Sequence, residues 1–245
     1  VFDGSDLTVA ANFSGGAGND ALTGGTAGDI LSGDAGDDIL RGNAGADQLR
    51  GGAGNDTLYA DSADTVIEGG AGTDTLHVEG TTGVTIGAGA GIETAFGNVG
   101  NDVFDGSDLT VAANFSGGAG DDILTGGSGN DVLTGGLGDD SLSGGAGQDR
   151  ATFTGVMSSY RFSHSVAGLV VTDVLGGEGS DTLVDVETLS FSDGDLQVAL
   201  VDGLYTLSGS ALAETITIDG TVGLALDGGA GDDILTGGSG NDTLK

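Results

Sequence analysis

The sequence predicts an all-β protein, a solenoid of short parallel strands stacked coil upon coil, and three observations support this. A nine-residue unit, Gly-Gly-x-Gly-x-Asp-x-U-x with U a large apolar residue, recurs without a gap along much of the chain. Glycine accounts for 53 of the 245 residues, and proline, cysteine and tryptophan are absent. No apolar period of 3.6 residues persists, so helix is not expected anywhere.

Composition and charge exclude several classes of protein. Five basic residues face 38 acidic ones, for a net charge of −33, so a phosphate backbone is an unsuitable partner. Without cysteine there is no disulfide framework. No apolar run approaches the roughly 20 residues needed to cross a bilayer. High charge and few bulky residues are typical of disorder, and only the order of the residues contradicts that interpretation.

The repeats place each residue type where backbone geometry requires it. Seven consecutive units span 15–77, and others span 117–152 and 228–245. Glycines at positions one, two and four permit a tight loop with positive φ. The last three residues suffice for a short strand whose apolar residue points inward. Two units would form a flattened coil of 18 residues that buries an apolar ladder: Leu22, Leu31, Leu40, Leu49, Leu58, Ile67 and Leu76.

This repeat resembles the calcium-binding nonapeptide of the repeats-in-toxin (RTX) family of secreted bacterial proteins. The resemblance covers about half of the chain. It implies a right-handed parallel β-roll, or β-helix solenoid, whose loops bind calcium through the sixth-position aspartate and through loop carbonyls of successive coils.

A longer repeat overlies the nonapeptides. Residues 1–25 match residues 103–127 at 23 of 25 positions, and a weaker copy starts near Gly209. We expect a first β-roll module at 1–96, a second leading coil and roll at 97–152, and a third module at 208–245. Because the chain starts and stops inside repeats, we expect it to be a piece of a longer repetitive protein.

Residues 153–207 break the period and hold five of the 11 aromatic residues. The stretches 160–166 and 169–175 flank Ala167-Gly168, which predicts a hairpin. We therefore expect an antiparallel β insert that caps the second roll. Residues 176–184 also fit the nonapeptide, but no matching repeat stands 18 residues away, so they are not expected to form a full site.

Stacked aspartates are the candidate metal ligands, because facing carboxylates repel one another unless a cation lies between them. Calcium accepts six to eight oxygens, whereas magnesium demands strict octahedral geometry. The 18-residue spacing predicts pairs at 20/38, 29/47, 38/56, 56/74, 122/140 and 131/149, with a near-pair at 102/122 and a gap where Thr65 faces Asp47. About six to eight ions are expected. The candidate ligands are Asp20, Asp29, Asp38, Asp47, Asp56, Asp74, Asp102, Asp122, Asp131, Asp140, Asp149, Asp233 and Asp242.

No catalytic constellation is visible, and the chain is not expected to be an enzyme. Its only histidines, His77 and His164, have no zinc-ligand spacing, and neither a His-Glu-x-x-His motif nor a Gly-x-Ser-x-Gly elbow is present. Both histidines are expected at the surface.

Together these features predict a calcium-binding, extracellular or cell-surface module that folds when calcium binds. The resemblance implies export by type I secretion machinery. The parent protein is expected to be a large structural or adhesive protein, or alternatively a secreted protease, lipase or alginate epimerase with this segment as its C-terminal domain. An open-ended solenoid is also expected to self-associate end to end.

Overall fold

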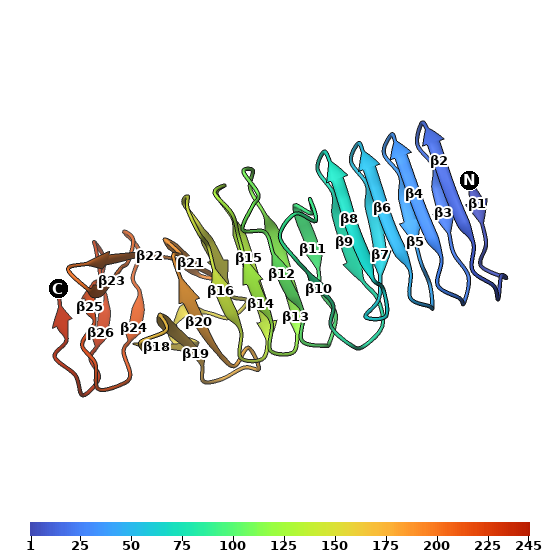
Figure 1. Cartoon of the computed structure of the whole chain (residues 1–245). Coiled ribbons are helices and arrows are strands. Elements are labelled where there is room, and N and C mark those ends of the chain that lie inside the picture. The colour runs from blue at the N-terminus through green and yellow to red at the C-terminus, as the bar shows by residue number, and fades with distance from the viewer.

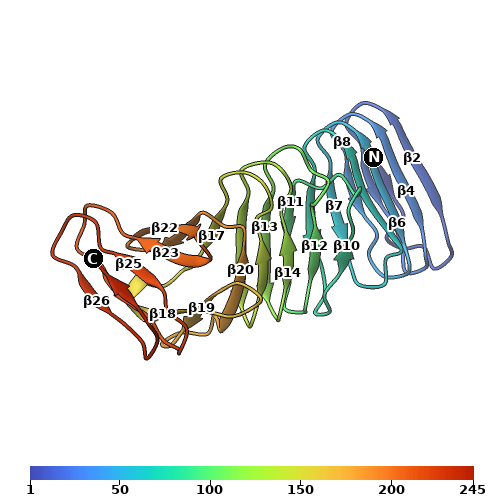
Figure 2. The ribbon, with the colours of Figure 1, turned by 60° about the vertical axis from the view of Figure 1, so that its left-hand side comes forward.

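The computed structural model describes the whole chain, residues 1–245. Short strands stack in a long row from the N-terminus to the C-terminus, and turning the molecule shows a flattened coil with loops along both long edges (Figures 1 and 2). The single helical element is the 3₁₀ turn η1 (Met157–Ser159). No helix has the length and hydropathy needed to cross a membrane. The fold is therefore an all-β parallel solenoid, as the repeats predict.

One face of the solenoid is a single sheet that runs the length of the chain. Its strands, in order, are β1 (Phe2–Asp3), β3 (Ala21–Thr23), β5 (Ile39–Arg41), β7 (Thr57–Ala60), β9 (Thr75–Val78), β11 (Thr94–Phe96), β13 (Asn114–Ala119), β15 (Val132–Leu137), β17 (Arg150–Thr152), β21 (Thr188–Phe191), β22 (Gly194–Val201), β23 (Leu204–Ser208), β25 (Ala225–Asp227) and β27 (Thr243–Leu244).

The opposite face is divided into three sheets. The first contains β2 (Asn12–Ala17), β4 (Ile30–Ala35), β6 (Gln48–Ala53) and β8 (Val66–Ala71). The second contains β10 (Thr85–Ile86), β12 (Val103–Asp105), β14 (Ile123–Thr125), β16 (Ser141–Ser143), β20 (Ser180–Val184), β19 (Leu169–Asp173) and β18 (Tyr160–His164). The third pairs β24 (Thr215–Thr217) with β26 (Ile234–Thr236).

The pairing register confirms the 18-residue coil. Leu22 lies opposite Leu40 on one face, and Leu31 lies opposite Leu49 on the other. The apolar ladder forms the core, and Leu49 is completely buried. Ile67 is only half-buried, because the sheet pairing is interrupted between β8 and β10 and a cleft of about 270 Å³ opens beside it. A change in coil length at 79–93 causes this interruption.

The stretch after the second roll combines two kinds of pairing. Strands β18 and β19 form an antiparallel hairpin around Ala167-Gly168, as the sequence predicts. Strands β20 and β21, however, return to the solenoid and pair in parallel with β16 and β17. Setting residues 176–184 aside as an isolated repeat was therefore wrong. The hairpin loops out of the coil, and the repeat resumes 41 residues after its partner instead of 18.

The buried ladder predicts a position-dependent cost of truncation. Replacing Leu49, which is fully buried, by Ala should lower the free energy of unfolding by about 2–5 kcal/mol because it leaves a cavity. Leu244 is 46% exposed in the last strand, and its replacement by Ala should change stability by less than about 0.5 kcal/mol. Urea unfolding at one fixed calcium concentration compares them, and equal effects would contradict the ladder.

Candidate metal centre

Each coil carries a loop at either long edge, and each loop ends in a residue that precedes a strand (Figure 2). Ten of the thirteen predicted aspartates are buried at these loop ends, whereas Asp20, Asp233 and Asp242 are half-buried. The acidic residues form two rows. The first row precedes strands of the 14-stranded sheet and contains Asp20, Asp38, Asp56, Asp74, Glu93, Asp131, Asp149 and Glu187. The second row lies along strands of the opposite face. Asp29, Asp47, Asp102, Asp122 and Asp140 each precede a strand, Asp64 stands two residues before β8, and Asp181 lies within β20.

One oxygen of each aspartate joins successive coils. The backbone N–H of Asp20 donates to Oδ1 of Asp38 at 2.7 Å, and that of Asp38 donates to Oδ1 of Asp56 at 2.8 Å. The near-pair keeps this contact, since the N–H of Asp102 donates to Oδ1 of Asp122 at 2.7 Å across 20 residues. The predicted pairs therefore do stack, but Oδ1 of the second partner is already engaged by the backbone.

The other oxygen is the one available to a ligand. Oδ2 is buried without a hydrogen-bond partner in seven aspartates: Asp38, Asp47, Asp56, Asp74, Asp122, Asp140 and Asp149. Burying a polar atom without a partner costs about 1–3 kcal/mol, more if it is charged. These seven oxygens are therefore the strongest sign of an absent partner.

Beside four of these aspartates, Asp38, Asp56, Asp74 and Asp149, a backbone carbonyl of the next coil lies close to the free oxygen. A Cβ placed on Gly51 would lie 2.5 Å from the carbonyl oxygen of Gly69 and would also abut Oδ2 of Asp56. A Cβ on Gly69 would lie 2.6 Å from Oδ2 of Asp74 and against the carbonyl of Gly91. The first glycine of the repeat thus keeps open a space in which a carboxylate oxygen and a carbonyl oxygen converge.

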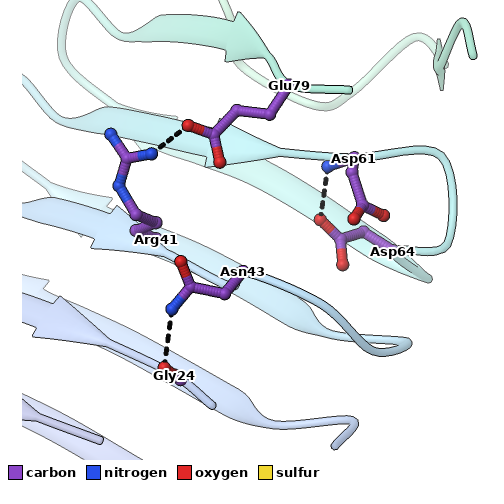
Figure 3. A network of polar contacts seen from close by, with 6 residues as sticks. All are labelled: Gly24, Arg41, Asn43, Asp61, Asp64 and Glu79. Atoms are coloured by element: carbon purple, nitrogen blue, oxygen red, sulfur yellow. Dashed lines mark hydrogen bonds and ion pairs between the residues drawn. The ribbon is translucent and has the colours of Figure 1, made fainter. Parts of the chain in front are cut away.

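The expected gap beside Asp47 contains a carboxylate after all. Thr65 occupies the sixth position, but Asp64, one residue earlier, accepts the Asp47 N–H through Oδ1 at 3.0 Å. Its Oδ2 accepts the N–H of Asp61 at 2.9 Å (Figure 3). The prediction that Asp47 lacks an acidic partner was therefore wrong, because the side chain of Asp64 reaches the Asp47 N–H from one residue before the sixth position while the strands keep the 18-residue register.

Three glutamates and Asp181 also join these rows. Sequence spacing did not reveal Glu93 or Glu187, whereas Asp181 fits the nonapeptide at 176–184 and Glu214 stands in the weaker copy that starts near Gly209. Glu93 accepts the Asp74 N–H at 2.7 Å and Glu187 accepts the Asp149 N–H at 2.8 Å, across 19 and 38 residues. Asp181 accepts the Asp140 N–H at 2.9 Å. Glu214 occupies the equivalent position before β24. A signal was present, because each glutamate stands in a Glu-Thr pair that opens a short alternating strand.

Charge makes these rows unstable without a cation. Fourteen carboxylate side chains are buried, whereas no basic side chain is. Desolvation, together with repulsion from neighbouring carboxylates, raises the pKa of Asp74 and Asp140 to about 6, of Asp122 to about 7 and of Asp181 to about 8. Buried carboxylates need a counter-charge or a proton.

The donor set fits calcium. Every candidate donor is a hard oxygen, and calcium accepts carboxylates and backbone carbonyls at about 2.3–2.6 Å. No three acidic, histidine or cysteine side chains gather into a single metal-binding cluster. Backbone carbonyls from the glycine loops would therefore supply most of the ligands.

The histidines lie away from these rows. His77 stacks between Tyr59 and Phe96 on the outer face of the long sheet, with ring centroids 5.1 and 5.0 Å away. Burial and the Arg41 guanidinium lower its pKa. His164 lies in the hairpin beside Tyr205.

Without metal, acid should favour the fold. Burial raises the pKa of Asp74, Asp122 and Asp181 from 3.8 in the unfolded chain to about 6, 7 and 8 in the folded chain, so the folded chain binds more protons. Their stabilising contribution is complete below the unfolded pKa and is lost as pH rises through about 6–8. In calcium-depleted buffer the β signal in circular dichroism should be stronger at pH 5.5 than at pH 8. A weaker signal at pH 5.5 would contradict the burial of these carboxylates.

Comparison with known families agrees with this geometry. The model of the RTX calcium-binding nonapeptide repeat matches residues 14–49, 41–76, 87–108, 116–151 and 226–244, which is more than half of the chain. All thirteen sixth-position aspartates lie within the matched stretches. A search of curated proteins finds no match. The chain therefore belongs to the RTX calcium-binding nonapeptide repeat family, with its repeats folded into a parallel β-roll.

Proposed function

We propose that the chain is a structural module whose folding depends on calcium bound between successive coils. The observation that carries this proposal is the set of buried carboxylate oxygens without partners, four of which lie close to a backbone carbonyl of the next coil. The ligands would be the sixth-position aspartates together with those carbonyls. A bound cation would supply the charge that the five surface basic residues cannot bring to these rows.

Calcium binding and folding would be one equilibrium. Oxygens from two coils meet only in the stacked structure, so the unfolded chain has no preformed site, and binding free energy becomes folding free energy. Extracellular calcium modules bind with dissociation constants of about 10⁻⁴–10⁻³ M. Such a chain would stay unfolded in a cytosol with little calcium and would fold after export, which agrees with the type I secretion typical of the family.

The modular sequence favours a structural or adhesive role outside the cell. Residues 1–25 recur almost unchanged at 103–127, and each copy leads into a roll with the same pairing register. A repeated, rod-like unit suits a large surface protein better than the single tail of a secreted enzyme. We therefore propose modules at 1–96, 97–152 and 208–245. Between the last two, the hairpin of β18 and β19 leaves the coil, and β20 and β21 rejoin the solenoid in parallel.

Calcium should drive folding. In excess chelator at pH 8 the circular dichroism spectrum should be that of a coil, because the buried carboxylates repel one another. Millimolar calcium should convert it to a β spectrum, and magnesium at the same concentration should do so poorly. A β spectrum that persists in chelator at pH 8 would contradict the proposal.

A single methyl group should block one site. In the Gly51→Ala variant the Cβ would occupy the space between Oδ2 of Asp56 and the carbonyl of Gly69, and Gly51 does not have positive φ. The variant should bind one ion fewer and need several-fold more calcium to fold. Gly87→Ala is the matched control, because a Cβ there meets nothing within 4 Å. Calcium titrations that cannot distinguish the two variants would count against ligation at this point.

A further inference from the structure

The loops of the roll exist in two states that the repeat motif does not distinguish. In the open state Oδ2 of the sixth-position aspartate has no partner, as in the seven aspartates named above. In the closed state Oδ2 accepts a backbone N–H from the second residue of its own repeat. Gly25 donates to Asp29 at 2.6 Å, Asn98 to Asp102 at 3.0 Å, and Gly127 to Asp131 at 2.8 Å. In the closed state, the oxygen that a cation would need is thus already hydrogen-bonded to a backbone N–H of the same repeat.

Backbone conformation at the second residue separates the two states. In open loops this residue has positive φ, for example +118° at Gly52 and +115° at Gly136. Asn43 also has positive φ, +65°, although asparagine adopts this region less readily than glycine. The second residues of the closed loops, Gly25 and Asn98 and Gly127, all lie outside this region. Their N–H groups consequently turn inward to the carboxylate.

An irregular neighbouring coil accompanies each closed loop. The N–H of Thr26 donates to the carbonyl of Leu7 at 3.0 Å, and that of Ser128 donates to the carbonyl of Leu109 at 2.9 Å. Leu7 and Leu109 belong to the two copies of the leading coil, which has no Gly-Gly loop there. The third closed loop also contacts the preceding irregular coil, but through a side chain: the amide of Asn98 donates to the Thr82 carbonyl at 3.1 Å.

The closed loop at 24–29 also has one of its carbonyls engaged. The side-chain amide of Asn43, in the next loop along this edge, donates to the Gly24 carbonyl oxygen at 2.7 Å (Figure 3). An ion beside Asp29 would meet the inward-pointing N–H of Gly25, which opposes a cation because an N–H presents its positive end. The loop would also have one carbonyl fewer to offer.

We infer that calcium binds in the open loops and not in the closed ones. The repeat motif and its 18-residue spacing therefore do not predict by themselves which loops hold an ion. The loop 126–131, a perfect Gly-Gly-x-Gly-x-Asp, would hold no ion. The loops ending at Asp140 and Asp149 would each hold one, although the coil that faces them lies beyond an inserted hairpin. Asp140 and Asp149 are 3% and 1% exposed, and Oδ2 has no partner in either. This inference rests on the proposed calcium-dependent function.

Two neighbouring isosteric variants test the inference. Asp140→Asn keeps an oxygen for the Asp122 N–H but removes the free Oδ2, so native mass spectrometry should count one calcium fewer than in the wild-type chain. Asp131→Asn should leave the calcium count unchanged. It should nevertheless lower the melting temperature, because an amide cannot accept both the Ala113 and the Gly127 N–H.

Loss of an ion in Asp131→Asn, or none in Asp140→Asn, would overturn the inference. If Asp131→Asn does not fold, anomalous scattering from calcium-loaded crystals of the wild-type chain decides the matter. Peaks are expected beside Oδ2 of Asp140 and of Asp149 and none beside Asp131, and a peak beside Asp131 would refute the two-state assignment while leaving the proposed function standing. A wild-type chain that binds no calcium would overturn both.

Discussion

Burial of acidic side chains at the edge of every coil is the constraint on which the rest of the structure depends. Each aspartate has two oxygens with two roles. Oδ1 ties one coil to the preceding coil through a backbone N–H, so the carboxylate is part of the solenoid even before an ion is considered. Oδ2 is left without a hydrogen-bond partner in seven of them, where a cation or a proton could neutralise it. The first glycine of the repeat follows from this arrangement, because any side chain there would fill the space between Oδ2 and the facing carbonyl.

Sequence predicted the periodic part of this structure well, because a nine-residue repeat converts directly into stacking. Leu22 lies opposite Leu40, 18 residues along the chain. The same 18-residue separation gives the strand register, the buried ladder and the rows of aspartates. The resemblance to the RTX family supplied the identity of the ion, which spacing alone does not specify. The fold and the stacking of the sixth-position aspartates were therefore accessible from the chain itself.

The repeat spacing did not predict every carboxylate of the two rows. Hydrogen bonds form between groups that are close in space, whatever their separation in the sequence. Asp64 enters its row from one residue before the sixth position, and Asp181 enters from beyond a hairpin. Glu93 shows how a longer coil is accommodated, because its extra methylene group reaches back to the Asp74 N–H. A solenoid tolerates such insertions because each coil contacts only its neighbours. Glu178 fastens the inserted hairpin to the resumed repeat, accepting hydrogen bonds from Tyr160 and Thr154.

The duplication locates the cause of the closed state. The leading coil is identical in the two copies from Val1 to Gly18 and from Val103 to Gly120. In both copies the loop nearest to it on the same edge is closed, although one loop reads Gly-Gly-Thr-Ala-Gly-Asp and the other Gly-Gly-Ser-Gly-Asn-Asp. Two different loops next to the same coil share one state, so the neighbouring coil sets the state and the loop's own sequence does not. A junction between modules thus satisfies its aspartate internally, through a backbone N–H of the same loop.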